Sequence, residues 1–199
     1  RANVDTDQII PKQFLKSIRR TGFGESLFFD WRYLENGSPD PAFELNAPHL
    51  KGATILVTRN NFGCGSSREH AVWAVVQYGF RVVIAPSRAQ ESSRIPAFAD
   101  IFRNNSVKNG LLLVELSESD VENIFQQAIR NKGLKATVDL PRQQVTLNLA
   151  SPVSFHFDID AGVKDYLMKG LDDIGQTMQH LDEILAFEKK HDAQMPNRQ

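Results

Sequence analysis

The first half of the chain switches between two patterns of apolar positions. Residues 53–59 form a β-branched apolar run typical of a buried strand, and apolar residues then recur at helical spacing from Ala71 to Tyr78. Gly79 is placed to end this helix, and residues 81–86 form a second apolar run. A strand, a helix and a strand within about 35 residues predict a parallel unit with a right-handed crossover.

A further helix and strand follow, and then a longer helix. Residues 98–109 are predicted to be helical, and residues 111–116 form another run typical of a buried strand. Ser117 is placed to cap a helix over residues 118–131, whose apolar residues lie on one stripe. Together these segments predict an α/β fold with a mixed or parallel sheet at its core.

Shorter segments follow Gly133. Residues 136–139, 143–149 and 153–158 alternate between apolar and polar positions and are separated by turns. This pattern predicts a small antiparallel meander.

The chain ends in two predicted helices, over residues 160–169 and 171–189. The second helix carries an apolar stripe on one face, formed by Leu171, Ile174, Met178, Leu181 and Leu185. We expect this stripe to dock the helix on the body of the domain. Binding of the helix to a partner protein is the alternative interpretation.

A length of 199 residues suits one substantial hydrophobic core. We expect a single domain over residues 1–199 that has three parts: a strand-helix-strand core over 1–132, the meander over 133–160 and the C-terminal helices over 161–190. Hydrophobic residues make up 41% of the chain and its formal charge is −1, which is ordinary for a globular protein. Neither value indicates nucleic acid or an anionic membrane as a partner.

No apolar run approaches the roughly 18 residues that span a bilayer, so we expect a cytoplasmic location. The chain has one cysteine, Cys64, which excludes an internal disulfide bond. One cysteine cannot by itself hold a zinc ion or an iron–sulfur cluster, because such sites need about three or four protein ligands. Any metal chemistry must therefore use ligands from another chain.

The most distinctive motif is Phe-Gly-Cys-Gly-Ser-Ser-Arg-Glu-His, residues 62–70, between a predicted strand and a predicted helix. Ser66 and Glu69 have the spacing of a capping box, so the helix is expected to begin at Ser66 or Ser67. Helix-terminal amides and the guanidinium of Arg68 would then face the same place, which predicts a site for a carboxylate or phosphate.

A purely structural strand-to-helix turn is the alternative interpretation of this motif. The loop lacks the lysine and the spacing of a P-loop, and it does not have the G-x-G-x-x-G pattern. It also differs from the nucleophile elbow, in which one serine stands between two glycines.

Five segments together resemble the small subunits of bacterial 3-isopropylmalate dehydratases, in the aconitase superfamily. They follow the family's order along nearly the whole chain and are residues 3–11, 61–70, 78–81, 108–111 and 170–175. The Gly-x-Gly-Ser-Ser-Arg-Glu-His motif is typical of the swivelling domain of that superfamily. The other segments favour the isopropylmalate branch.

The resemblance implies a β/β/α swivelling domain that closes over a large subunit with a bound [4Fe–4S] cluster, so that the two chains form a heterodimer. It implies a hydro-lyase of leucine biosynthesis that interconverts 2-isopropylmalate and 3-isopropylmalate by removing and re-adding water. The small subunit is expected to be active only with the large subunit and to bind no cofactor itself.

The resemblance also implies roles for single residues. Ser66 matches the family's base, and Arg68 is expected to bind a substrate carboxylate. Ser67 would donate a hydrogen bond to the substrate or hold the turn. Asp7 is expected to pair with an active-site cation or to orient a histidine of the partner. A carboxylate that only fixes the loop is the alternative for Asp7.

Recognition of the isopropyl group is expected from the segment over residues 21–27. Phe23 and Leu27 are the candidates for this contact, and a place in the hydrophobic core is the alternative for both. His70 is expected to support the site from behind or to be structural, with a catalytic role as the alternative. Cys64 is expected to be a small packed side chain and no cluster ligand. Residues 12–21 predict a weak helix.

One segment departs from the family pattern. Residues 88–97 look like a ten-residue insertion after the strand over 81–86. The segment is polar, so a surface loop can accommodate it. It follows the carboxyl end of a strand, where α/β proteins usually bind ligands, and could perturb the site or the subunit interface.

Two alternative functions remain open from the sequence. One is the small subunit of a related aconitase-type hydro-lyase of the citramalate or homoaconitate class. The other is a non-catalytic module that binds carboxylates through the glycine-rich turn.

Overall fold

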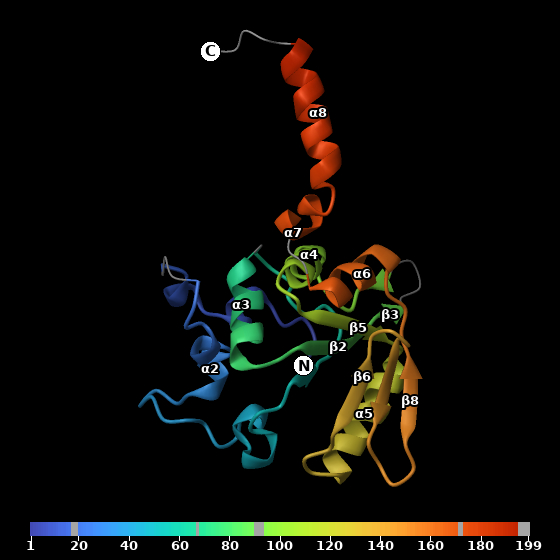
Figure 1. Cartoon of the computed structure of the whole chain (residues 1–199). Coiled ribbons are helices and arrows are strands. Elements are labelled where there is room, and N and C mark those ends of the chain that lie inside the picture. The colour runs from blue at the N-terminus through green and yellow to red at the C-terminus, as the bar shows by residue number, and fades with distance from the viewer. Residues whose placement is uncertain (17–19, 67, 90–93, 171–172, 195–199) are drawn as a thin grey trace.

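A three-stranded parallel sheet lies at the centre of the molecule (Figure 1). The computed structural model describes residues 1–16, 20–66, 68–89, 94–170 and 173–194. The sheet has the order β1–β2–β5, with β1 over Ile55–Val57, β2 over Val82–Pro86 and β5 over Leu112–Leu116. Both neighbouring pairs are parallel, which confirms the predicted α/β class and its strand-helix-strand unit.

Helices lie on both faces of this sheet, and every residue of the central strand β2 is therefore buried. Val83 and Ala85 face a core that they share with α3 (Glu69–Tyr78) and α4 (Asp100–Lys108). Val82 and Ile84 face a second core, which they share with α5 (Glu118–Arg130). This alternation follows from the two-residue period of a strand.

Two helices begin or end where the sequence predicted: α3 ends at Gly79 and α5 begins after Ser117. Gly79 ends α3 with φ +125°, a conformation that glycine adopts without a steric penalty. The Ser117 hydroxyl accepts a hydrogen bond from the Asp120 amide at 3.1 Å and caps α5 as predicted.

The predicted meander is present and shares a core with the central sheet. Strands β6 (Ala136–Asp139), β7 (Gln144–Leu147) and β8 (Val153–His156) pair in antiparallel order. Val145 and Leu147 are buried against the same apolar cluster as Leu116 of β5. The meander is therefore packed on the body of the molecule.

The N-terminal third consists of short helical turns around aromatic side chains. These turns are α1 (Thr6–Ile9), α2 (Phe29–Arg32) and four 3₁₀ turns over Lys12–Lys16, Gly24–Ser26, Glu44–Asn46 and Pro48–Leu50. The weak helix predicted over residues 12–21 is thus a 3₁₀ turn over Lys12–Lys16, and residues 17–19 lie outside the described part.

The segment interpreted as an insertion contributes two short strands. β3 (Arg88–Ala89) pairs antiparallel with β4 (Arg94–Ile95), and residues 90–93 between them lie outside the described part. The chain then returns to the body at residues 96–98, where the amide of Phe62 donates to the carbonyl of Ala97 at 3.0 Å.

The C-terminal region differs from the prediction. After α6 (Ala161–Lys169), the expected single helix over 171–189 is divided into α7 (Asp173–Met178) and α8 (Leu181–Gln194). α8 projects away from the body in Figure 1.

The docking predicted for the last helix is therefore wrong in this structure. Met178 at the end of α7 remains 52% exposed, and Leu181 and Leu185 in the projecting α8 remain 39% and 51% exposed. Leu171 and the side chain of Ile174 lie outside the described part. Across the described residues, no helix is both long and apolar enough to cross a membrane.

Candidate active site

The loop between β1 and α3 makes two close approaches that require glycine. Gly63 has φ +77°, and a Cβ atom built on it would lie 2.3 Å from Cγ of Phe102 in α4. Gly65 has φ +89°, and its Cβ would lie 3.3 Å from Cβ of Asp5. The first contact is sterically impossible and the second is tight, so the loop lies directly on α4 and on the N-terminal segment.

The N-terminal segment runs alongside this loop and is joined to it by a series of backbone hydrogen bonds. The amide of Asn3 donates to the carbonyl of Asn60 at 3.0 Å. Further along, the amide of Gly63 donates to the carbonyl of Val4 at 2.8 Å, and the amide of Thr6 donates to that of Cys64 at 2.9 Å. This pairing places the polar residues over 5–7 beside the glycine-rich turn.

A capping box fixes α1 at the end of this pairing. Oδ1 of Asp5 accepts a hydrogen bond from the Gln8 amide at 2.8 Å, and Oε1 of Gln8 accepts one from the Asp5 amide at 3.0 Å. The sequence analysis missed this box, although Asp-x-x-Gln has the required spacing.

The capping box predicted at Ser66 and Glu69 is wrong. α3 begins at Glu69, and its N-cap residue is Arg68 in an extended conformation with no side-chain cap. Oε1 of Glu69 instead accepts a hydrogen bond from Nδ2 of Asn109 at 3.1 Å. The positive φ of Gly65 and the extended Arg68 keep Ser66 outside the helix.

Asp7 and Arg68 form an ion pair across the two segments. Nη1 of Arg68 donates to Oδ1 of Asp7, and Nζ of Lys12 lies 3.8 Å from Oδ2 of the same carboxylate. The side chain of Arg68 is only 14% exposed, whereas that of Asp7 is 39% exposed. A largely buried guanidinium is thus held in place by a carboxylate at the edge of the site.

Ser66 lies exposed beside this ion pair. Its carbonyl accepts a hydrogen bond from the hydroxyl of Thr6 at 2.9 Å. The structure therefore brings together Ser66, Arg68 and Asp7, three of the predicted site residues. Ser67, a fourth, lies outside the described residues, so its predicted role stays a prediction.

Cys64 and His70 flank the turn. Burial, and after it the negative charge of Asp5, raise the pKa of the Cys64 thiol above its ordinary value. The ring of His70 packs against Phe23 and Trp73, with centroids 5.2 and 4.7 Å away. In the described part of the chain, no group of three or more His, Cys, Asp or Glu side chains could hold a metal ion, and a raised thiol pKa does not favour cluster ligation.

Phe23 and Leu27 lie in the hydrophobic core. Their exposed fractions are 3% and 0%. Neither side chain presents surface to a ligand in this structure, which favours the core alternative over contact with an isopropyl group.

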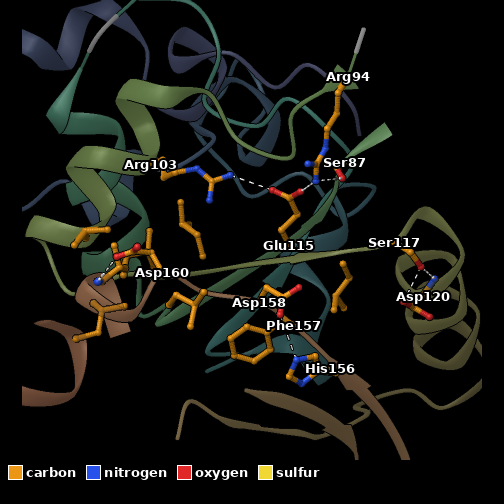
Figure 2. Close-up of a pocket in the computed structure, with 17 residues that line it drawn as sticks. Ser87, Arg94, Arg103, Glu115, Ser117, Asp120, His156, Phe157, Asp158 and Asp160 are labelled. Carbon is orange, nitrogen blue, oxygen red and sulfur yellow. Dashed lines mark hydrogen bonds and ion pairs between the residues drawn. The ribbon is translucent and has the colours of Figure 1, made fainter. Parts of the chain in front are cut away.

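A cavity of about 640 Å³ lies elsewhere, between the end of β5 and the turn before α6, and includes neither Ser66 nor Arg68. Figure 2 shows Arg94 and Arg103 reaching the carboxylate of Glu115 from two sides at its rim. The two guanidinium groups share this one carboxylate. These ion pairs join Arg94 of β4 and Arg103 of α4 to Glu115 of β5.

The family model described as aconitase C-terminal domain matches residues 1–119. A second model, described as the C-terminal domain of the 3-isopropylmalate dehydratase small subunit, matches residues 173–197. A crystal structure of 3-isopropylmalate dehydratase from Methanocaldococcus jannaschii has a TM-score of 0.61 at 21% identity and covers 96% of this chain and 93% of its own. That likeness shows the swivelling-domain fold.

Two curated relatives match almost the whole chain, and both are described as 3-isopropylmalate dehydratase small subunit. The protein from Desulforapulum autotrophicum is 56% identical over 198 residues, which are 100% of this chain and 92% of the relative. The protein from Rhodopirellula baltica is 57% identical over 190 residues, which are 95% of this chain and 91% of the relative. With its fold and its serine–arginine turn, the chain belongs to the family of 3-isopropylmalate dehydratase small subunits.

Proposed function

We infer that the chain is the small subunit of a 3-isopropylmalate dehydratase of leucine biosynthesis, a hydro-lyase that interconverts 2-isopropylmalate and 3-isopropylmalate. The observation that carries this inference is the exposed Ser66 beside Arg68, whose guanidinium is held by Asp7. Identity of 56–57% to relatives of that description supports it over the citramalate, homoaconitate and non-catalytic alternatives.

The chain supplies half of an active site in this proposal. Its single cysteine cannot hold a [4Fe–4S] cluster, so a large subunit of the aconitase type would carry it. When bound there, the cluster supplies a Lewis acid for the hydroxyl group that leaves the substrate. The exposed side of Ser66 is the surface over which that subunit would close.

Ser66 acts as the base that removes a proton from carbon and returns it in the reverse direction. A serine hydroxyl is a weak base at neutral pH, so its ionised form needs stabilisation. The positive N-terminal end of α3, three residues further along the chain, and the guanidinium of Arg68 supply positive potential. Closure by the partner would exclude water and strengthen both effects.

Arg68 binds a carboxylate of the substrate. A guanidinium has five N–H donors, so the bond to Asp7 leaves others for a planar, bidentate contact. The ion pair with Asp7 holds the guanidinium in one orientation before substrate arrives. Asp7 is thus the orienting carboxylate of the pair.

Reconstitution with a cluster-bearing large subunit tests the function. Mixing the two chains should give hydration and dehydration activity, which ultraviolet absorption of the unsaturated intermediate follows. The rate with isopropylmalate should exceed the rates with citramalate and homocitrate-class acids. Absence of activity with a demonstrably intact cluster would contradict the inference.

Ser66→Ala tests the assignment of the base. We expect kcat to fall about a hundredfold to ten-thousandfold, the range of general acid–base catalysis. Association with the large subunit, measured by sedimentation, should change little. Ser151→Ala, at another exposed serine, is the matched control and should keep full turnover. Normal turnover by Ser66→Ala would show that the base is another group.

A further inference from the structure

Thr6 has an unusual position beside the serine turn. It is buried, at 2% exposure, although it begins α1 between two acidic residues, Asp5 and Asp7. Its amide donates to the carbonyl of Cys64 at 2.9 Å, and its hydroxyl donates to the carbonyl of Ser66 at 2.9 Å. The two bonds reach the residues on either side of Gly65.

The bonds matter because Gly65 leaves the backbone free to rotate. Glycine has the largest range of backbone conformations, and Gly65 adopts a positive φ of +89°. Rotation at this residue would move the Ser66 side chain relative to Arg68. A residue with a side chain would be strained at this position, because φ is positive and its Cβ would lie 3.3 Å from Cβ of Asp5.

We propose that Thr6 is a positioning residue for Ser66, whose backbone it holds through the hydroxyl-to-carbonyl bond; this rests on the proposed function. Thr6 acts on Ser66 and touches no reacting atom. Misplacement of a catalytic group by about 1 Å can cost a hundredfold in rate, so one hydrogen bond at this point has a large effect.

Thr6 can act in this way because its own position is fixed. The Asp5 and Gln8 capping box holds the first turn of α1, and Ile9 and Ile10 are fully buried in the core behind it. The Thr6 hydroxyl is therefore attached to the rigid body of the molecule, whereas the turn that it contacts is rich in glycine. Thr6 is also uncharged, so replacing it leaves the charges of Asp7 and Arg68 unchanged.

Thr6→Val and Thr6→Ser separate the hydroxyl from the shape of the side chain. Valine keeps the shape and removes the donor, and serine keeps the donor. In the reconstituted enzyme, we expect Thr6→Val to lower kcat about tenfold to a hundredfold with little change in KM or in affinity for the large subunit. Thr6→Ser should stay within about threefold of the wild type, since it retains the bond.

Thr58→Val is the matched control. Thr58 is also buried, at 4% exposure, and its hydroxyl also donates to a backbone carbonyl of the N-terminal segment, that of Arg1 at 3.1 Å. The bond lies at the other end of the pairing between the segments. Thr58→Val should therefore lose stability much as Thr6→Val does but keep its kcat.

A measurement on the isolated chain adds a readout that does not depend on activity. Amide hydrogen exchange should become faster at the turn around Gly65 and Ser66 in Thr6→Val and should be unchanged there in Thr58→Val. Unchanged exchange at the turn, or a kcat of Thr6→Val equal to that of the wild type, would overturn the proposal. An inactive wild-type enzyme with an intact cluster would instead contradict the proposed function.

If Thr6→Val does not fold, a comparison of Thr6→Ala with Thr6→Ser tests the role of the hydroxyl instead. Both lose the threonine methyl group, and only serine keeps the donor. A kcat for Thr6→Ala at least tenfold below that of Thr6→Ser supports the proposal, in line with the cost of misplacing a catalytic group. Equal kcat values would overturn it.

Discussion

Arg68 and Cys64, in the turn around Ser66, are each affected by a nearby carboxylate. The side chain of Arg68 is only 14% exposed, and its guanidinium is paired with the carboxylate of Asp7. At Cys64, two residues before Ser66, burial and the negative charge of Asp5 raise the pKa of the thiol. The same turn thus holds a paired guanidinium and a thiol whose ionised form is disfavoured.

The raised pKa of Cys64 predicts slow alkylation. The thiolate is the reactive form, so at pH 8 iodoacetamide should modify the folded chain more slowly than the urea-unfolded chain, and the rate should rise with pH. Asp5→Asn should increase the rate at pH 8, since it removes the negative charge that raises the pKa and keeps the Oδ1 acceptor of the helix cap.

The control for this experiment is alkylation in urea, where wild type and Asp5→Asn should react at the same rate. Mass spectrometry of the modified chain measures both rates. An equal or slower rate in folded Asp5→Asn would contradict the effect of Asp5 on the thiol.

At the scale of elements, the site depends on how a loop lies between helices. The turn over residues 61–66 is pressed against α4 through Gly63 and against the segment before α1 through Gly65. α3 begins three residues after Ser66, which leaves the serine on the loop. In the proposed site, the helix would supply positive potential and the loop the hydroxyl of Ser66.

Gly63→Ala tests the contact between this loop and α4. The added Cβ would lie 2.3 Å from Cγ of Phe102, so the loop or the ring must move. Gly52→Ala is the control, because Gly52 has a similar φ of +80° and no atom lies within 4 Å of the place that its Cβ would occupy. We expect Gly63→Ala to lower the free energy of unfolding by about 1–3 kcal/mol more than Gly52→Ala.

Urea unfolding measures both variants. Because the two glycines have nearly the same φ, the difference between them reports the steric contact and not the backbone strain. Equal losses in the two variants would show that the Phe102 contact relaxes without cost.

The whole molecule divides into a packed body and a projecting end. Two apolar cores cover the two faces of the central sheet, and the meander completes the second. α8 lies outside both, with Phe187 67% exposed. A helix with its apolar residues in water contributes little to the stability of the body.

Truncation after Gly170 tests this division. Removal of α7 and α8 should change the midpoint of thermal unfolding of the body by less than about 2 °C, because surface changes away from the core usually cost under 0.5 kcal/mol. Phe157→Ala, at a core side chain with 2% exposure, is the positive control and should cost about 3–5 kcal/mol. A large fall in the midpoint on truncation would show that the C-terminal helices pack on the body in solution.

Much of the fold followed from local patterns. The strands β2 and β5, the end of α3 at Gly79 and the cap of α5 at Ser117 all agree with the sequence, because periodicity and capping act between residues close in the chain. The start of α3 differs from the prediction, because the backbone conformation at Gly65 and the contact of Glu69 with Asn109 override the local capping signal of Ser66.

The sequence by itself predicted most of the elements, the family and three polar residues of the candidate site, Asp7, Ser66 and Arg68. The tertiary structure decided how they meet. Asp7 and Arg68 are 61 positions apart, and Thr6 reaches Ser66 across 60, so their contacts exist only once both segments pack on the same core. It also decided that Phe23 and Leu27 belong to that core and that α8 stands free of it, because burial depends on which surfaces the whole chain brings together.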